Sequence, residues 1–174
     1  MSTPTGLIAP PPGLGQLSVL EPMDGRLGYS VGAQTAESAY LSLFRVSRPT
    51  TITTIKLLIG TAAGEVDVGF YTSDDTTWTR IASVGATAAA GSSAIQTLTL
   101  IESVTLAPGI DYWFAYTSHD TGGGVAAIRH LSGLSAMGGV GKKAIAKASA
   151  WSSGLPATIT TLAGTGITVW WSGE

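Results

Sequence analysis

The sequence is a succession of short stretches in which apolar and polar residues alternate, separated by clusters of Gly, Ser, Asp and Pro. Such alternation is typical of β-strands, because successive side chains of a strand point to opposite faces. Val66, Val68 and Phe70 share one face of a predicted strand. Asp67 and Gly69 share the other. The predicted strands cover residues 40–46, 52–59, 65–71, 78–84, 94–101, 110–117, 125–131 and 167–171.

The remaining local patterns fit the same fold class. Residues 110–117 are apolar on both faces, which favours a central or interface strand. Residues 142–150 have the one spacing compatible with a helix and predict a short helix or a loop. Ser73 to Thr76 predict a hairpin loop in which a carboxylate accepts backbone N–H bonds. Residues 106–112 predict a tyrosine corner, where the hydroxyl of Tyr112 bonds to backbone upstream. Together they predict an all-β chain, an antiparallel β-sandwich that is jelly-roll-like.

Residues 1–28 predict an extended N-terminal arm ahead of a sandwich domain at 29–174. Pro4 and the run Pro10–Pro12 exclude a helix there, because proline fixes φ and pushes the preceding residue into extended geometry. The arm is rich in large aliphatic residues, which need a surface to pack on. That surface is either the arm's own domain or a partner. The candidate contact residues are Leu7, Ile8, Leu14, Leu17, Val19 and Leu20.

Composition and charge remove several classes of protein. The chain has no Cys, so it has no disulfide framework and no thiolate metal site. A net charge of -2 gives no basic surface for nucleic acid. Only 11% of the residues are charged, against about 25% in an average protein, which fits a surface covered by neighbouring subunits. No apolar stretch is long enough to span a bilayer and no secretory signal begins the chain, so we expect synthesis in a cytoplasm and no membrane partner.

Candidate chemistry is sparse. His119 and Asp120 end a predicted strand, but neighbouring strand residues point to opposite faces, so they make a poor acid–base or metal pair. Residues 137–143 are rich in glycine but lack the spacing of a phosphate-binding loop. We therefore expect no enzyme, no catalytic residue, no metal and no cofactor. The acids that could gather into a calcium site, although no calcium-loop spacing supports it, are Glu65, Asp67, Asp74, Asp75, Asp111 and Asp120.

Four tryptophans are candidates for binding a glycan or a subunit interface. An indole face stacks on sugar rings, and Trp78, which follows a turn, is the best single candidate for such a platform. The alternative for all of them is packing in the core or between subunits. Trp170 and Trp171 are adjacent in a predicted strand and must face opposite sides of it. Trp151 completes the set.

Several motifs between residues 51 and 117 resemble a known module. They are Ile55 to Gly64 leading into Val66 to Tyr71, then Gly85 to Ala88, and then Leu106 to Gly109 with Tyr112 and Trp113. This region resembles a β-sandwich module of tailed-bacteriophage accessory virion proteins, including head-decoration, head-fibre and minor tail proteins. The resemblance implies a non-enzymatic particle component without cofactor, a homotrimer, in contact with the major capsid protein or other virion subunits.

The expected function is therefore a virion structural protein that decorates the capsid or forms a fibre on it. Attachment would use the N-terminal arm and self-association. The alternative is a carbohydrate- or receptor-binding module of a tail tip or tail fibre, which would bind a host-surface glycan.

Overall fold

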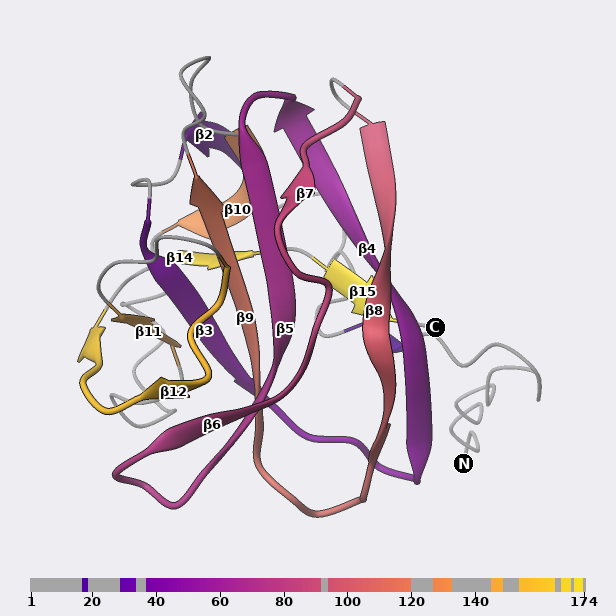
Figure 1. The fold of residues 1–174 in the computed structure, drawn as a ribbon, viewed down its shortest axis with the longest axis vertical. Helices are drawn as coiled ribbons and strands as arrows, with labels where there is room; N and C mark the ends of the chain where they lie inside the picture. The colour runs from indigo at the N-terminus through magenta and orange to yellow at the C-terminus, as the bar shows by residue number, and fades with distance from the viewer. Residues whose placement is uncertain are drawn as a thin grey trace, which may run out of the picture.

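The chain forms two antiparallel β-sheets that pack face to face (Figure 1). The computed structural model describes residues 17–18, 29–33, 37–91, 94–119, 127–132, 145–148, 154–164, 167–169 and 171–173. Within these residues there are strands and no helix, which confirms the predicted all-β class and the antiparallel β-sandwich.

The described strands divide into sheet A and sheet B. Sheet A contains β1 (Leu17–Ser18), β2 (Tyr29–Ala33), β4 (Thr50–Thr61), β8 (Ala94–Leu106), β10 (Ala127–Ser132), β14 (Ile167–Val169) and β15 (Trp171–Gly173). Sheet B contains β3 (Ala39–Phe44), β5 (Glu65–Ser73), β6 (Trp78–Ser83), β7 (Thr87–Ala88), β9 (Tyr112–His119), β11 (Ile145–Ala148), β12 (Thr158–Ile159) and β13 (Ala163–Gly164).

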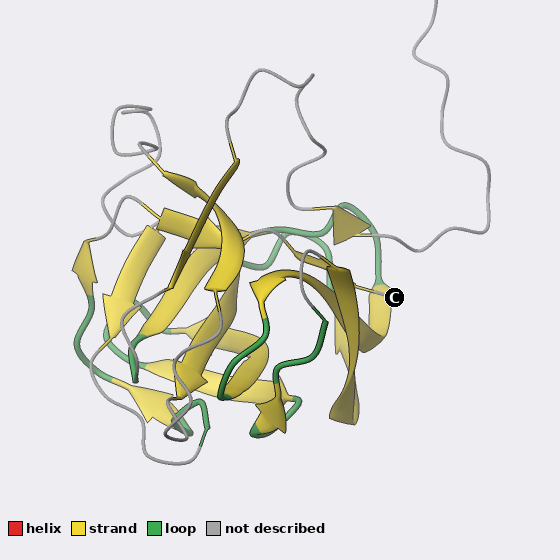
Figure 2. Ribbon diagram, turned by 90° about the horizontal axis from the view of Figure 1, so that it is seen from above, coloured by secondary structure: helices red, strands yellow, loops and turns green. Residues whose placement is uncertain are grey.

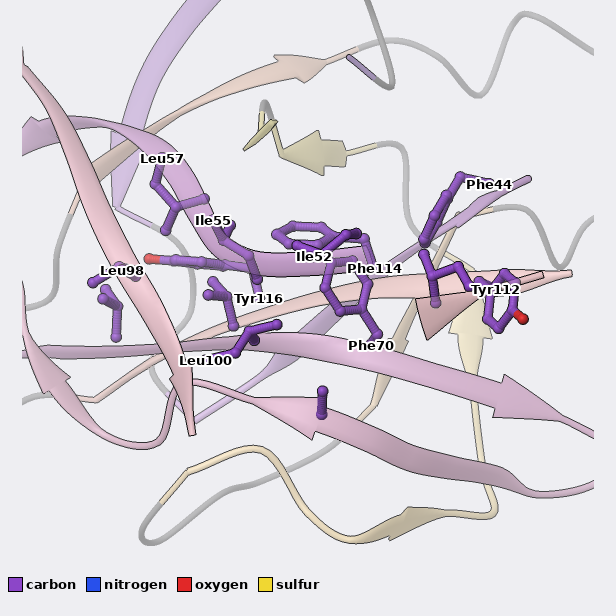
Figure 3. Packing of buried hydrophobic residues seen from close by; sticks show 14 of the residues in the cluster. Phe44, Ile52, Ile55, Leu57, Phe70, Leu98, Leu100, Tyr112, Phe114 and Tyr116 are labelled. Carbon is purple, nitrogen blue, oxygen red and sulfur yellow. The ribbon is translucent and has the colours of Figure 1, made fainter. Parts of the chain in front are cut away.

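The main core lies between the two sheets and is built from every second residue of the facing strands (Figure 3). Ile55 and Leu57 of β4 face it from sheet A, and Phe70 and Phe114 face it from sheet B. The rings of Phe70 and Phe114 meet edge to face with their centroids 6.0 Å apart. Each fully buried aliphatic or aromatic side chain contributes roughly 1.5–3 kcal/mol by leaving water, so this layer is the principal source of stability.

Strand β9 is covered on both faces, as its apolar sequence predicts. It lies between β3 and β5 and is buried from Tyr112 to Ser118. Phe114 and Tyr116 point into the main core, while Trp113 and Ala115 point to the opposite side of sheet B. A second apolar layer must therefore cover that side.

The second layer forms because sheet B curls until its two ends are joined by the chain. β12 pairs with β6 at one end and β13 pairs with β11 at the other, and residues 160–162 link β12 directly to β13. Seen from above, the strands lie around the interior rather than in two flat layers (Figure 2). The residues buried in the curl are Ala39, Leu41, Tyr71, Trp78, Trp113, Ala115, Leu155 and Ile159.

Residues 142–150 correct one prediction. The described part, Ile145–Ala148, is strand β11 and is neither a helix nor a loop. It pairs with β3 on one edge and β13 on the other. An isolated helix this short is marginal in water, whereas the open edge of β3 offers backbone partners at once. Long-range pairing therefore overrides the local preference of Ala and Lys.

Two other differences from the predicted strands exceed a shift of two residues at an end. β8 continues to Leu106, beyond the expected end at Ile101, because its second half pairs with the start of β4. The run expected as one strand at 167–171 contains two: β14 pairs with β10, and β15 pairs with β4. The chain thus changes partners within sheet A, which the local pattern does not reveal.

Both predicted turn devices are confirmed. The backbone N–H of Ala107 donates to the hydroxyl of Tyr112 over 3.0 Å, which closes the tyrosine corner. In the hairpin between β5 and β6, Oδ1 of Asp74 accepts the backbone N–H groups of Thr76 and Thr77 at 2.9 and 2.7 Å. The hydroxyl of Thr76 donates to the same oxygen at 2.7 Å. This bond and the two N–H bonds lower the pKa of Asp74, because they stabilise the carboxylate.

Candidate interaction surface

The side of sheet A that faces away from the core carries the most exposed large apolar residues of the described chain. On β8, Ile95 is 58% exposed and Ile101 is 72% exposed. Ile95 is paired in register with Leu58 of β4. We call this surface the β4–β8 face; its outward residues are Thr54, Lys56, Leu58, Ile95, Thr97 and Thr99, and Ile101 lies at its edge, beside the loop after β6.

Threonine forms most of the rest of this surface. Thr54 is paired with Thr99, and Lys56 with Thr97, so hydroxyls and methyl groups alternate along it. β4 and β8 together contain two charged residues, Lys56 and Glu102. The desolvation of a β-surface with exposed isoleucine and threonine and with so little charge costs little free energy, since few charges lose their hydration.

A large bulge in β8 displays Ile101. The register passes from Thr54–Thr99 to Ile52–Val104, so β8 contributes extra residues between two short paired segments. An added Cβ at Gly85 would meet the Cδ1 atom of Ile101 at 3.2 Å, which places the isoleucine over the loop after β6. The bulge therefore turns one apolar side chain outward where the two sheets approach each other.

Part of the β8 edge is capped by a side chain. Among the described strands β8 pairs only with β4. The Gln96 side-chain amide donates to the carbonyl of Ala88 at 2.9 Å and accepts from the N–H of Ala90 at 3.0 Å. Gln96 thus replaces a strand partner at this point and ties sheet A to the loop after β7, which protects the edge from pairing with another chain.

A buried polar cluster fastens the curl of sheet B. Asp67 is fully buried, and its carboxylate accepts the N–H of Gly85 at 2.9 Å and that of Leu155 at 2.7 Å. The hydroxyl of Tyr71 donates to the carbonyl of Pro156 at 2.6 Å. The Arg80 guanidinium donates to the carbonyl of Leu155. Three residues of sheet B therefore hold the 154–162 segment through its backbone.

The electrostatics of this cluster follow from burial. Burial raises the pKa of Asp67, although the N–H groups of Leu155 and Gly85 act in the opposite direction. Burial also raises the pKa of Tyr71. The Asp67 carboxylate, the Tyr71 hydroxyl and the Arg80 guanidinium each bond to the backbone of the chain. We therefore interpret the cluster as structural and call it the polar lock. The alternation pattern placed Asp67 opposite the core correctly, but nothing local indicated that this face is covered.

Trp78 corrects the expectation of an exposed stacking platform. Its side chain is 5% exposed and meets Trp113 edge to face, with ring centroids 5.9 Å apart. A bulge explains the placement: Phe70 pairs with Ala82 but Tyr71 pairs with Arg80, so Ile81 is an extra residue. The bulge puts Trp78 on the inner side of the curl, where no ring face is open to a sugar.

Three of the carboxylates considered for a calcium site have separate structural partners. Asp67 is in the buried cluster, Asp74 caps the β5–β6 hairpin, and Asp111 pairs with Arg45, whose Nη2 lies 3.1 Å from Oδ2. Within the residues that the structure describes, no three His, Asp or Glu side chains are grouped to hold a metal. Glu65 lies opposite His119 in the register of β5 and β9.

His119 has a different acidic neighbour from the one its sequence suggests. Its Nδ1 atom lies 3.3 Å from Oε1 of Glu37, at the end of β9. Asp120, the neighbour considered from the sequence, lies outside the described residues. The other histidine, His130, is on β10 and pairs in register with Val169 and Ser30.

Several candidate binding residues fall outside the described structure. Trp151 and Trp170 are among them, while Trp171 is described only as the first residue of β15, opposite Leu57. Of the arm residues, Leu17 belongs to β1, which pairs with β15 at the side of sheet A. The arm residues outside the described part are Leu7, Ile8, Leu14, Val19 and Leu20.

Comparison with known proteins gives this chain no relative: no protein-family model, curated protein or solved structure matches it. No helix in the described residues could cross a lipid bilayer.

We take the β4–β8 face as the candidate interaction surface because of its exposed isoleucines and its few charges.

Proposed function

We propose that this chain is a non-enzymatic structural protein of a tailed-bacteriophage particle. It decorates the capsid or forms a fibre on it, and it is held there by its N-terminal arm and by self-association, as a homotrimer. Its partners are the major capsid protein or other virion subunits, and it is made in the host cytoplasm before it joins the virion.

The observation that carries this proposal is the β4–β8 face. Ile95 and Ile101 are exposed on a surface with few charges, which suits burial against another protein. The motifs that resemble the phage module lie in β4, β5, β7 and the tyrosine corner. They belong to the framework of the sandwich, which leaves its surfaces to determine attachment.

The experiment is gold labelling of intact particles with an antibody against this chain. Label over the heads supports decoration. Label at the distal end of the tail contradicts it and supports the receptor-binding alternative, which would then turn to Trp151, since Trp78 is buried. Particles without label would contradict a virion role altogether.

The arm is tested with full-length protein added to particles that lack it. Leu7→Ser, Ile8→Ser and Leu14→Ser together should reduce co-sedimentation with particles at least about tenfold, because each buried aliphatic contributes roughly 1.5–3 kcal/mol. The matched control is Thr3→Ser, Thr5→Ser and Ala9→Ser, which changes the same segment without removing a large aliphatic side chain. Equal binding by the two variants would contradict attachment through these aliphatic residues.

A further inference from the structure

We propose that copies of this chain associate head to tail, with the bulge of β8 in one copy packed on the β4–β8 face of the next. The bulge contributes Ile101 and Glu102, and the face contributes Leu58, Ile95 and Lys56. This inference rests on the proposed function, which includes self-association as a homotrimer, and it names the two surfaces that meet. It follows from the directions of the exposed isoleucines and from the charge beside each of them.

The two most exposed isoleucines of the described residues point in different directions. Ile95 is on the β4–β8 face, in register with Leu58. Ile101 is at the edge of that face, beside Gly85 in the loop after β6. A two-fold contact between two β4–β8 faces would cover Ile95 and leave Ile101 in water. A contact between the bulge of one copy and the face of another covers both.

One chain cannot cover these two isoleucines with each other. Ile95 and Thr99 are the ends of a regularly paired stretch of β8, which spans about 13 Å at roughly 3.3 Å per residue. Ile101 lies beyond Thr99, in the bulge before Val104. The two side chains are therefore too far apart to touch, and a contact between them requires a second copy.

Each isoleucine has one charged residue near it, and the two charges are opposite. Lys56 is half-buried on the face, two residues before Leu58 on β4. Glu102 is exposed next to Ile101. Head-to-tail packing brings the carboxylate of one copy to the ammonium of the next. Face-to-face packing would instead bring two lysines together, and the outward residues of the face include no acid.

The spacing allows the apolar contact and the charge contact at the same time. Lys56 and Leu58 share one face of β4 and are about 7 Å apart. Ile101 and Glu102 are adjacent, so their Cα atoms are about 3.8 Å apart and their side chains span the remaining distance. Gln96 caps part of the β8 edge with its amide, so the contact is made by side chains and not by an added strand.

A copy of the same chain fits these surfaces because every copy carries one bulge and one face. A head-to-tail contact leaves one bulge and one face uncovered at the ends of the assembly until a ring closes. Closure at three copies, as the proposed function expects, covers all of them. The low charge of the chain, 11% of its residues, suits such burial, since interface cores contain few charged residues.

The test measures the mass of the purified full-length protein by light scattering over a series of concentrations. The wild type should form a trimer. Ile95→Lys and Ile101→Lys should each weaken association at least about tenfold, because each buries an ammonium among aliphatic side chains. Ile110→Lys is the matched control and should keep the trimer, since Ile110 is 47% exposed before β9 and belongs to neither surface.

A mixture of the two isoleucine variants tests the head-to-tail geometry, at a concentration where each variant alone is monomeric. The Ile95→Lys copy keeps a normal bulge, and the Ile101→Lys copy keeps a normal face, so one contact between them stays intact. The expected product is a dimer with one copy of each variant, which cannot close into a ring. A mixture that stays monomeric would overturn the head-to-tail contact.

The charge pair is tested by reversing each charge. Lys56→Glu and Glu102→Lys should each weaken association at least about tenfold, because like charges then meet across the contact. The two changes in one chain should restore the trimer. A double variant that associates as weakly as the single variants would overturn the pairing of these two surfaces.

The remaining outcomes also decide the question. Trimers that persist in both isoleucine variants would overturn this inference and leave self-association through another surface. A wild type that is monomeric at every concentration would overturn self-association as well. Circular dichroism checks that each variant unfolds like the wild type, and Ile95→Thr or Ile101→Thr replaces a variant that does not fold. Particle labelling is a separate measurement, so the virion role can stand if this contact fails.

Discussion

Two glycines show that the reason for a small residue differs from one position to the next. A Cβ added at Gly69 would lie 2.3 Å from the carbonyl oxygen of Ala82 on the neighbouring strand. Gly109 has space around it but a φ of 78°, in the turn before the tyrosine corner. The first glycine is required by packing between strands and the second by backbone conformation.

Replacement of Gly69 by Ala should destabilise the fold by about 3 kcal/mol, because a backbone carbonyl must move to make room. Gly109→Ala should cost about 1 kcal/mol from the left-handed conformation alone. Urea unfolding of both variants, compared with the wild type, measures the difference. A smaller loss for Gly69→Ala than for Gly109→Ala would contradict the close strand approach.

Burial raises the pKa of one carboxyl group in the β5–β6 hairpin, whereas hydrogen bonding lowers the pKa of another. Asp67 has its pKa raised by burial, whereas the pKa of Asp74 is lowered by donors from Thr76 and Thr77. Asp74 therefore contributes stability that is present above its ordinary pKa and is lost as the pH falls through the lower value. Protonation of Asp67 is favoured by folding, so it changes stability with the opposite sign.

Carbon-detected NMR titration of the two side chains should show Asp67 protonating at a higher pH than an unfolded-chain Asp and Asp74 at a lower one. Asp74→Asn should also flatten the decline of stability at acid pH, measured by thermal unfolding between pH 5 and 2. Equal pKa values for the two carboxyl groups would contradict the difference between their environments.

At the scale of elements, the 154–162 segment decides the environment of sheet B. It closes the curl between β6 and β11, and its backbone is held by Asp67, Tyr71 and Arg80. In addition, the N–H of Arg80 donates to the carbonyl of Ala157 at 2.9 Å. Leu155 and Ile159 then bury against Trp78 and Trp113. The polar lock sets the position, and the apolar contacts supply most of the stabilisation.

Asp67→Asn should loosen this segment, because an amide in the same orientation turns a donor toward the N–H of Leu155. Leaving a buried donor unpaired costs about 2 kcal/mol. Hydrogen exchange at the Leu155 amide should therefore become faster by about tenfold or more. Tyr71→Phe is the matched control: it removes one bond to the same segment and creates no repulsion, so its effect on exchange should be smaller. Unchanged hydrogen exchange at Leu155 in Asp67→Asn would show that the carboxylate does not hold this segment.

At the scale of the whole molecule, the C-terminal part of the chain contributes strands to both sheets. β12 and β13 complete sheet B, and β14 and β15 complete sheet A. β15 pairs with the middle of β4, next to core residues Ile55 and Leu57. Such long-range pairings raise the contact order, so folding requires contacts between residues that are far apart in the sequence.

A chain that ends at residue 153 should therefore lose its cooperative thermal transition, as measured by circular dichroism. Removal of residues 1–16 is the control, because it leaves β1 in place, and we expect it to keep the transition. A sharp transition in the shortened C-terminal variant would show that the sandwich is complete without these strands.

The amino-acid sequence by itself determined the all-β class, the antiparallel sandwich, the central position of β9, the β5–β6 hairpin and the tyrosine corner. These features were predictable because alternation, turn residues and the spacing from Pro108 to Tyr112 are local. The six aliphatic residues of the arm and the low charge also pointed to a surface that contacts protein, although the sequence did not show which surface.

Only the tertiary structure decided which faces are covered. Asp67 and Leu155 are 88 residues apart in sequence, so the burial of Asp67 depends on a contact that no local pattern encodes. The same holds for Trp78, which a bulge turns into the curl, and for β11, which exists because β3 has an open edge. Strand periodicity fixes which side chains share a face, but the fold decides whether that face meets water, another sheet or another segment of the chain.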